Sequence, residues 1–443
     1  MKKSLLIGLV VMSFAALPLF AHGQKENSGA ATASSSTPSG SITVFWWGSP
    51  ERNAKTDAVI NLFRKAYPSI HVSGENEGWT QYWQKVTVEA SAHTLPCATQ
   101  MQARQMLTYT NNGVFAPLDG LISSGAIDVS KMPKAVLLSG TGVDGKIYMI
   151  PYGAAYDDFT YNKTMADKAG LPTPPPGYTW SWFENWLKEA KAKLPAGVWP
   201  IMQNGSDADI FISYAESHGY PLFDKQGQLG FPQSLLRTYW SIWLNFAKEG
   251  IAIPEDLAVQ EALGSSIEQS YLVKGKVMVE GEPGNQLPEG QKDANQIGTG
   301  TLAIITHPFG PKGMGNVLIT NGFSIPTSCT GADRNAAAAF INFFTNNPAG
   351  AKVFASDNGT VTDTSLLEAQ INSPSTSEPV KESLQLYEFI SKHNPPVVLY
   401  PPGYTAVFST LYAQIFQEIA SGKMTLDQGV QSFFSQAKQQ LSS

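Results

Sequence analysis

Charged residues are scarce in this sequence. Lys, Arg, Asp and Glu make up 15% of the 443 residues, against roughly 25% in ordinary globular proteins. The formal net charge is −6, so the chain has no basic footprint of the kind that binds a phosphate backbone. We therefore expect no nucleic-acid partner.

Cysteine and clustered histidine are also scarce. The chain has two cysteines, Cys97 and Cys329, no CxxC motif, and six histidines that never occur four residues apart. Structural zinc sites need closely spaced Cys and His ligands, so we predict no metal site and no cofactor. The two cysteines leave two alternatives open, a single long-range disulfide or two buried free thiols.

Complete GxSxG, HExxH and Walker A motifs are missing as well, and with them the usual signals of nucleophilic, metal-dependent and nucleotide-dependent catalysis. Residues 140–145 match GxGxxG, but an extended segment follows where a dinucleotide site needs a helix, so we interpret them as a loop. Asp207 and Asp209 resemble part of a calcium loop without its sixth-position glycine and closing glutamate. We expect a solvated or ligand-contacting loop there.

The N-terminus predicts secretion. Two lysines precede an apolar run over residues 5–20 and a small-residue site, which is the three-part plan of a signal peptide. The run is shorter than the ~20 apolar residues that span a bilayer. We predict a cleaved signal peptide at 1–23, a flexible leader at 24–40, no lipid-attachment cysteine, and a location in the periplasm or outside the cell.

The rest of the chain alternates strands and helices. A strand at Ile42–Trp47 precedes an amphipathic helix that ends before Pro68, and further strands are expected at 70–72 and 98–101. This alternation predicts the α/β class with mainly parallel, doubly wound sheets flanked by helices. About 400 residues exceed what one hydrophobic core holds, so we expect two lobes.

The middle of the chain predicts two crossings between these lobes. Two extended stretches, 146–153 and 159–162, mark the first, and the return strand 316–326 provides the second, followed by a helix with Asp333 as its N-cap. Further amphipathic helices are expected around Trp180 and over 235–248, and two more at the C-terminus.

Aromatic residues are abundant, at 11% with ten tryptophans. Ligands of doubly wound sheets sit outside the carboxyl ends of the strands. An aromatic ring there stacks on the C–H face of a sugar, and polar neighbours bond its hydroxyls. The candidate residues near predicted strand ends and crossings are Trp46, Trp47, Glu51, Glu77, Trp79, Tyr82, Gln100, Gln102, Tyr156, Asp157, Trp180 or Trp182, and Glu282.

Neighbouring residues of a strand face opposite sides. We therefore expect one of Trp46 and Trp47 in the core and the other at the site. Helix-borne tryptophans such as Trp186, Trp240 and Trp243 are more typical of a core.

Several short segments, in their order along the chain, resemble the family 1 extracellular solute-binding proteins of ABC importers, of the sugar- and maltodextrin-binding type. The segments are Ile42–Trp47, Tyr67–Ile70, Tyr82–Lys85, Asp144–Pro151, Tyr161–Lys163, Ala169–Leu171, Tyr178–Trp180 and Gly275–Met278. The resemblance spans nearly all of the chain after the leader.

This resemblance implies a two-lobed periplasmic-binding-protein fold that closes over a sugar by hinge motion. Lobe 1 would comprise 41–155 plus 318–368, and lobe 2 would comprise 156–317 plus 369–443. The implied protein is a monomer without catalytic residues that docks transiently on the transmembrane subunits of a permease. The residues implied to line its cleft are Trp46, Glu51, Glu77, Trp79, Tyr82, Gln100, Asp157 and Glu282.

The resemblance also bears on the cysteines. Where such proteins commonly read Pro-Asp before the third strand, this chain has Pro96-Cys97. The implied fold places the start of that strand beside the end of the return strand, where Cys329 lies. A disulfide between Cys97 and Cys329 is therefore expected.

Three alternatives remain open at this point. A secreted glycoside hydrolase would use a pair of carboxylates, for which candidates are plentiful near strand ends. A binding protein of the same fold would bind a polyol or a glycerophosphodiester in place of a sugar. A receptor that feeds chemotaxis or sensing would bind its ligand without importing it.

Overall fold

The structure is a computed structural model that describes residues 38–262, 267, 270–393 and 397–441. The predicted signal peptide lies outside the described residues, and so does the predicted leader as far as residue 37. The predicted leader end is slightly late, because Gly40 already pairs with Ile70 in the first strand.

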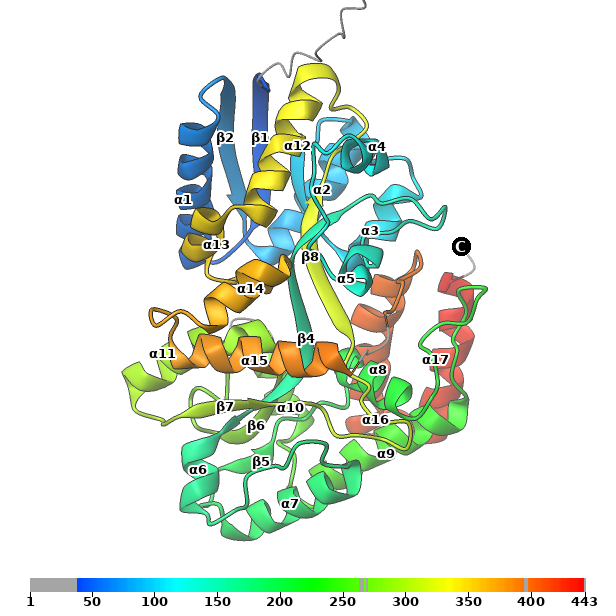
Figure 1. Cartoon of the computed structure of the whole chain (residues 1–443). Helices are drawn as coiled ribbons and strands as arrows, with labels where there is room; N and C mark the ends of the chain where they lie inside the picture. Colours follow the sequence, from blue (N-terminus) through cyan, green and yellow to red (C-terminus); the bar gives the residue numbers. More distant parts are fainter. Residues whose placement is uncertain (1–37, 263–266, 268–269, 394–396, 442–443) are drawn as a thin grey trace, which may run out of the picture. The chain divides into compact units, whose positions relative to one another are not determined.

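The N-terminal elements follow the predicted alternation (Figure 1). They are β1 (Gly40–Trp47), α1 (Pro50–Ala66), β2 (Ile70–Glu77), α2 (Trp79–Ala92) and β3 (Ala98–Gln102). The Ser49 side chain caps α1 by accepting from the backbone N–H of Arg52, and Pro50 occupies the first turn, where a missing N–H costs nothing. β1 pairs in parallel with both β2 and β3.

The long strand β4 (Ile150–Asn162) joins two groups of strands. Its first part pairs with β8 (Leu318–Ser324) and β9 (Thr360–Val361), and its second part pairs with β6 (Val277–Pro283) and β7 (Leu302–Ile305). Figure 1 shows β4 running from the region of β8 toward β6 and β7. All 13 of its residues are buried, so the two predicted extended stretches are one strand.

The sheet is mixed rather than mainly parallel. Its order is β2-β1-β3-β8-β4-β6-β5, with β5 at Trp199–Ile201. The pairs β1–β2, β1–β3 and β5–β6 are parallel, but every recorded pair that contains β4 or β8 is antiparallel. The prediction was wrong here because local alternation of strands and helices does not fix the direction of a strand that returns from a distant part of the chain.

The lobe boundary predicted after residue 155 falls inside β4. Tyr156 is the last residue that pairs with β8, opposite Leu318, and Asp157 is the first that pairs with β6, opposite Pro283. The division into lobes stays a prediction, and this change of partners is the feature of the sheet that coincides with it.

Helices cover the sheet. The α-helices not yet named are α3 (Ala103–Thr110), α4 (Asp119–Ser123), α5 (Lys134–Leu138), α6 (Lys163–Lys168), α7 (Trp180–Lys193), α8 (Ala208–Ser217), α9 (Gln233–Lys248), α10 (Glu255–Ala262), α11 (Leu287–Ile297), α12 (Gly331–Asn346), α13 (Pro348–Phe354), α14 (Thr364–Ile371), α15 (Glu378–Lys392), α16 (Tyr412–Ala420) and α17 (Leu426–Leu441). Two shorter elements are the 3-10 turn η2 (Gly284–Gln286) and the π-helical segment η3 (Thr405–Leu411). Within the described residues, no helix has the length and apolar character needed to cross a bilayer.

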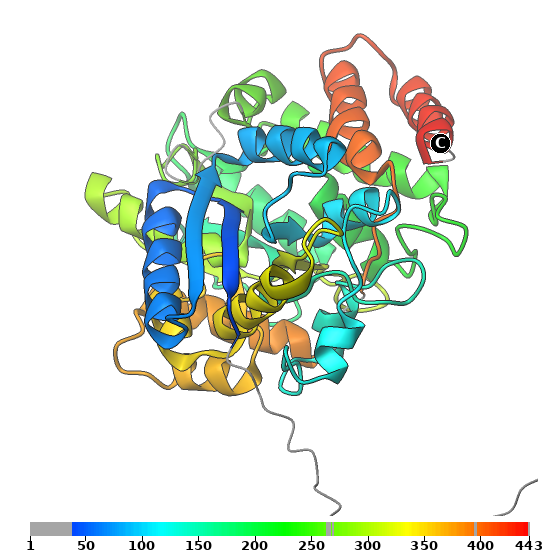
Figure 2. The same ribbon diagram turned by 90° about the horizontal axis from the view of Figure 1, so that it is seen from above.

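The helix-borne tryptophans Trp186, Trp240 and Trp243 lie in the core, as expected. Trp240 of α9 packs its ring near Tyr412 and Phe416 of α16 and Phe433 of α17, and α16 and α17 lie side by side (Figure 2). Residues 140–145 form turns and an isolated bridge, which agrees with their interpretation as a loop.

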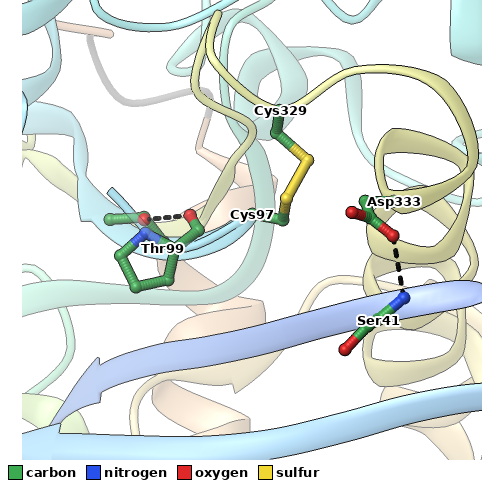
Figure 3. Close-up of a disulfide and its surroundings, with 6 residues drawn as sticks. Ser41, Cys97, Thr99, Cys329 and Asp333 are labelled. Carbon is green, nitrogen blue, oxygen red and sulfur yellow. Dashed lines mark hydrogen bonds between the residues drawn. A yellow bond between two sulfur atoms is a disulfide. The ribbon is translucent and has the colours of Figure 1, made fainter. Parts of the chain in front are cut away.

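Asp333 does not cap α12, contrary to the prediction. The N-cap is Thr330, and Asp333 lies in the first turn. Its Oδ1 accepts from the backbone N–H of Ser41 at 2.8 Å (Figure 3). The carboxylate therefore ties the start of β1 to α12, a contact between segments far apart in the sequence.

The structure contains the disulfide expected between Cys97 and Cys329 (Figure 3). β3 and β8 are antiparallel neighbours with Thr99 opposite Ser324, so the residues just before β3 and just after β8 meet at the same edge. The bridge closes a separation of 232 residues and fixes the return of the chain to its N-terminal strands.

Gln100 of β3 is a buried polar centre with 2% of its surface exposed. Its Oε1 accepts from the backbone N–H of Trp47 at 2.8 Å, and its Nε2 donates to the Tyr152 hydroxyl. Its backbone carbonyl accepts from the hydroxyl of Tyr82. One amide thus links β1 to β4 and holds the end of β1 in place.

We expect the Cys97→Ser/Cys329→Ser variant to melt at a lower temperature than the parent. Loss of a crosslink across a long loop increases the entropy of the unfolded chain and typically costs about 2–5 kcal/mol. Thermal melting checks the variant, and thiol titration checks the bridge directly. Two reactive thiols in the denatured, unreduced parent would contradict the disulfide.

We also expect Gln100→Leu to lower the free energy of unfolding in urea by about 1–3 kcal/mol, because the N–H of Trp47 is left buried without its partner. Gln436→Leu is the matched control, since Gln436 is an exposed helical residue whose side chain donates to Ser432 one turn earlier in the same helix. It should change stability by less than about 0.5 kcal/mol. Equal effects of the two changes would show that Gln100 has no special structural role.

Candidate ligand-binding cavity

A cavity of about 600 Å³ lies where β1, β2 and β3 end. It is lined by Trp47, Gly48, Ser49, Arg52, Gly78, Trp79, Thr80, Gln81, Gln102, Arg104, Ala155, Ile267, Pro283, Asn285, Gln286, Glu289, Ile319, Asn321 and Asn358. The volume is in the range of small-molecule sites. The carboxyl ends of the strands therefore do form one wall of a cavity, as topology led us to expect.

The opposite wall comes from a different part of the chain. Pro283 ends β6, Asn285 and Gln286 belong to η2, and Glu289 lies in the first turn of α11. Because β6 pairs with the second part of β4, the cavity lies between segments that β4 joins.

Trp79 provides an exposed aromatic surface at the cavity. It is 46% exposed, which is unusual for a tryptophan, and begins α2. Its ring packs edge-on against Trp47, with centroids 5.2 Å apart and planes at 81°. Trp47 is only 5% exposed and is held by Gln100 through its backbone. The pair thus consists of a fixed inner ring and an accessible outer ring.

Three amide side chains of the lining, those of Gln102, Asn321 and Asn358, form a hydrogen-bonded row that we call the floor of the cavity. Gln102 donates to the Oδ1 of Asn321 at 3.2 Å, and Asn321 donates to the backbone and side-chain oxygens of Asn358 at 3.1 Å. Asn358 in turn donates to the hydroxyl of Tyr152 at 2.8 Å. Each amide is oriented by the next, so the donors and acceptors of the floor are set before a ligand arrives.

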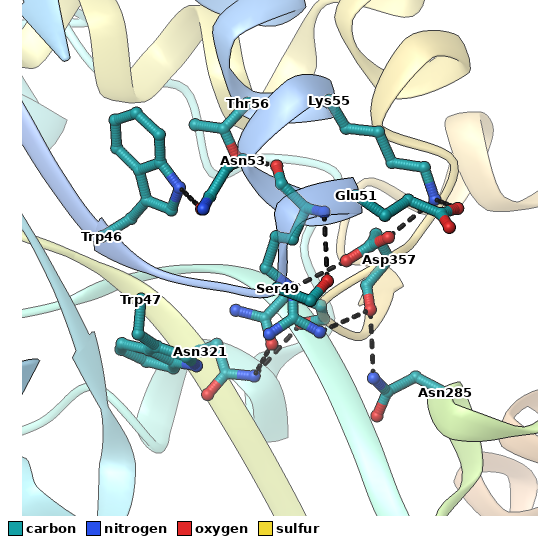
Figure 4. A network of polar contacts seen from close by, with 12 residues as sticks. Trp46, Trp47, Ser49, Glu51, Asn53, Lys55, Thr56, Asn285, Asn321 and Asp357 are labelled. Atoms are coloured by element: carbon teal, nitrogen blue, oxygen red, sulfur yellow. Dashed lines mark hydrogen bonds and ion pairs between the residues drawn. The ribbon is translucent and has the colours of Figure 1, made fainter. Parts of the chain in front are cut away.

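Arg52 is bound by Asp357. Its Nε donates to Asp357 Oδ1 at 2.6 Å, and its Nη2 donates to the Asp357 carbonyl at 3.3 Å. Lys55 binds the other carboxylate oxygen at 2.6 Å, and Asn285 donates to the Asp357 carbonyl at 3.1 Å (Figure 4). Asp357 therefore links α1 to η2 across the edge of the cavity.

Glu51 lies beside this network rather than in the cavity. It pairs with Lys55 at 3.0 Å and with Lys292 of α11 at 2.8 Å, and the hydrogen bond from Lys292 is the main reason that its pKa is lowered. Glu51 lines a neighbouring pocket of about 270 Å³ that shares Asn285 and Glu289 with the cavity. The structure thus assigns it an ion pair between α1 and α11.

Arg104 of α3 is the second cation of the lining. Its Nη2 lies 2.8 Å from a carboxylate oxygen of Asp157 and 2.8 Å from one of Asp209. Burial alone would lower the pKa of Arg104, but the carboxylates of Asp209 and Asp157 raise it well above its ordinary value. Asp157 was predicted to contact the ligand, but its carboxylate is buried and forms an ion pair with Arg104.

Four more candidates are buried in the core and do not line the cavity. Trp46 is 1% exposed and donates its Nε1–H to Asn53, Tyr82 is fully buried, and Gln100 and Tyr156 are each less than 5% exposed. Strand alternation turned Trp46 away from the side that Trp47 faces, so Trp47 holds the position that the family resemblance implied for Trp46. Tyr82 lies one helical turn after Trp79 on the inner side of α2.

Three further candidates also lie outside the cavity lining. Trp180 is 7% exposed and packs against Tyr214 and Tyr239. Glu77 ends β2 within 3.7 Å of Lys85, and Glu282 is half-buried on β6 opposite Asp158. Trp182, the alternative to Trp180, is half-buried on α7 and stacks near Trp186.

Sequence reasoning placed Trp47, Trp79 and Gln102 near strand ends, and all three line the cavity. It missed most polar lining residues, namely Arg52, Arg104, Asn285, Gln286, Asn321 and Asn358. Arg52 and Arg104 follow β1 and β3, and Asn321 lies on the return strand, so strand-end reasoning could have found all three. Asn285, Gln286 and Asn358 follow no local pattern, because their segments reach the cavity only through the crossings of the chain.

The chain is similar to known bacterial binding proteins. The family model described as bacterial extracellular solute-binding protein matches residues 58–378. A binding protein of Brucella abortus is 26% identical over 281 residues, which are 59% of this chain and 63% of that protein's length. The alignment thus leaves more than a third of this relative unmatched.

Two solved structures share the fold. The extracellular solute-binding protein family 1 from Alicyclobacillus acidocaldarius is 27% identical with a TM-score of 0.70, and the match covers 92% of this chain and 100% of that one. A periplasmic oligogalacturonide-binding protein from Yersinia enterocolitica, solved with saturated digalacturonic acid, is 18% identical with a TM-score of 0.76, covering 91% and 99%. At 18% identity the second likeness shows the fold alone.

The family model covers well over half of the chain, and the mixed sheet with its flanking helices matches the fold of the solved relatives. The chain therefore belongs to the bacterial extracellular solute-binding proteins.

Proposed function

We propose that this protein is the secreted substrate-binding subunit of an ABC importer, which captures a carbohydrate by hinge closure and delivers it to a membrane permease. The observation that carries the carbohydrate assignment is the exposed Trp79 at the edge of a cavity whose floor is a row of amides. The predicted signal peptide supports release to the periplasm or the outside of the cell.

The aromatic wall suits the apolar face of a sugar ring. Trp79 is 46% exposed, and its ring packs edge-on against the buried ring of Trp47. A ring held in this way loses little side-chain freedom when a ligand stacks on it, so most of the stacking energy contributes to affinity.

The polar wall suits hydroxyl groups. The lining includes the amides of Gln81, Gln102, Asn285, Gln286 and Asn321. Each amide offers both donors and acceptors, and a sugar hydroxyl needs both kinds of partner. Six amide residues in one cavity, counting Asn358, match a polyhydroxylated ligand better than an apolar one.

The lining of the cavity fits reversible binding of a sugar better than hydrolysis of a glycosidic bond. Most glycoside hydrolases use two carboxyl groups about 5–9 Å apart on either side of the scissile bond. Among the described residues that line the cavity, Glu289 supplies the one carboxylate, while Asp157 is engaged by Arg104. The hydrolase alternative therefore has little support from the geometry.

The contacts across the cavity fit a hinge. Glu51 of α1 pairs with Lys292 of α11, and Asn285 of η2 bonds the carbonyl of Asp357. Both contacts are polar, and polar contacts of this kind can break and re-form as the walls separate. The closed form would be the one that the permease subunits bind.

The proposal is tested by thermal melting against mono-, di- and oligosaccharides, polyols and glycerophosphodiesters. A ligand at a hundred times its Kd should stabilise the protein by ~2.7 kcal/mol, seen as a saturable shift of the melting temperature. Chromatography of the incubated sugar should show that it is not consumed. Turnover would establish an enzyme, and a shift with polyols or glycerophosphodiesters alone would replace the carbohydrate assignment.

Trp79→Ala should weaken sugar binding by about tenfold, the loss that corresponds to ~1.4 kcal/mol of stacking energy. Val88→Ala is the control, because Val88 lies on the same helix, is 68% exposed and is outside the cavity lining. Isothermal titration calorimetry measures both variants. Unchanged affinity in Trp79→Ala would remove the aromatic wall from the site.

A further inference from the structure

We infer that the cavity selects neutral sugars over sugars that carry a carboxylate or phosphate group, because its two arginines are already engaged by carboxylates of the protein. The inference rests on the proposed function and names the class of carbohydrate that the cavity accepts. It separates this protein from relatives of the same fold that bind acidic sugars, such as the oligogalacturonide-binding protein.

Recognition of a carboxylate or phosphate in a protein site usually requires a free arginine fork, which binds two oxygens at once. Of the described residues that line the cavity, Arg52 and Arg104 carry positive charge. The state of these two side chains therefore decides whether an anionic group has a partner there.

The fork of Arg52 is occupied. Its Nε and Nη2 both bind Asp357, one through the carboxylate and one through the backbone carbonyl. The Arg52 and Asp357 side chains are each 12% exposed, so the pair is largely withdrawn from solvent. A ligand carboxylate would have to displace Asp357, which also holds Lys55.

Arg104 is engaged through its Nη2. This nitrogen contacts both Asp157 and Asp209 at 2.8 Å, while the Nε is buried and has no hydrogen-bond partner among the described residues. One guanidinium therefore faces two carboxylates. A uronate that approached Arg104 would meet these two groups as well as the cation. Like charges in a partly buried site repel strongly because water screens them poorly.

The nearby lysines are also paired with carboxylates of the protein, so they do not replace the arginines as partners for an anionic ligand. Lys55 is shared between Asp357 and Glu51, and Lys292 pairs with Glu51. Glu289 adds a further carboxylate to the wall itself. By contrast, the amides of the floor carry no net charge and present donors and acceptors to hydroxyls.

The test compares sugars that differ only at C6. Neutral mono- and disaccharides, among them galactose and galactobiose, are titrated by calorimetry beside galacturonate and digalacturonate, with the same comparison for glucose and glucuronate. We expect every neutral sugar that binds to have an affinity at least about tenfold above that of its uronate. Tighter binding of a uronate would overturn the inference and leave the sugar receptor intact. Binding of no sugar, neutral or acidic, would overturn the proposed function itself.

The variant Asp209→Asn tests the role of the protein carboxylates. It replaces one of the two carboxyl groups that face Arg104 with a neutral amide and should raise the ratio of uronate to neutral-sugar affinity by about tenfold, which corresponds to ~1.4 kcal/mol of relieved repulsion. Asp427→Asn is the matched control, since Asp427 pairs with Arg237 on an exposed part of the molecule away from the cavity lining. An unchanged ratio in Asp209→Asn, with the protein folded as judged by its melting temperature, would overturn the inference.

Discussion

The pairing of β4 along both of its edges is the constraint on which the rest of the structure depends. The strand is buried along its whole length, and buried backbone groups need hydrogen-bond partners. These partners come from β8 and β9 for its first part and from β6 and β7 for its second. The sheet can therefore be completed only after distant segments of the chain have returned to β4.

The other long-range ties secure the same return. The Cys97–Cys329 disulfide joins the start of β3 to the segment after β8, and Asp333 binds the backbone of Ser41. Gln100 adds a buried link from β3 to both Trp47 and Tyr152. Together they hold the end of β1, and so Trp47, in a defined position at the cavity.

The position of the cavity follows from the change of partners along β4. Ala155, just before the change, lines the cavity, and so do Ile319 and Asn321 on β8 and Pro283 at the end of β6. One wall thus depends on β8 and the other on β6. Charge is scarce in the chain as a whole, and at this place it occurs as paired groups, which leaves uncharged amides and an exposed tryptophan to meet a ligand.

The sequence by itself determined the local elements and the kind of site. Periodicity and capping residues are local signals, which is why the helix that ends before Pro68 and the strand that ends at Trp47 were predictable. Strand-end reasoning also placed Trp79 and Gln102 at the site.

Only the tertiary structure decided which of Trp46 and Trp47 faces the cavity, that the sheet is mixed, and that Arg52 and Arg104 reach the cavity already paired. The physical reason is common to all three. Alternation along a strand fixes that neighbours face opposite sides but not which side is the core. Strand direction, register and ion-pair partners are set by hydrogen bonds and contacts between residues far apart in the sequence, such as Arg52 with Asp357.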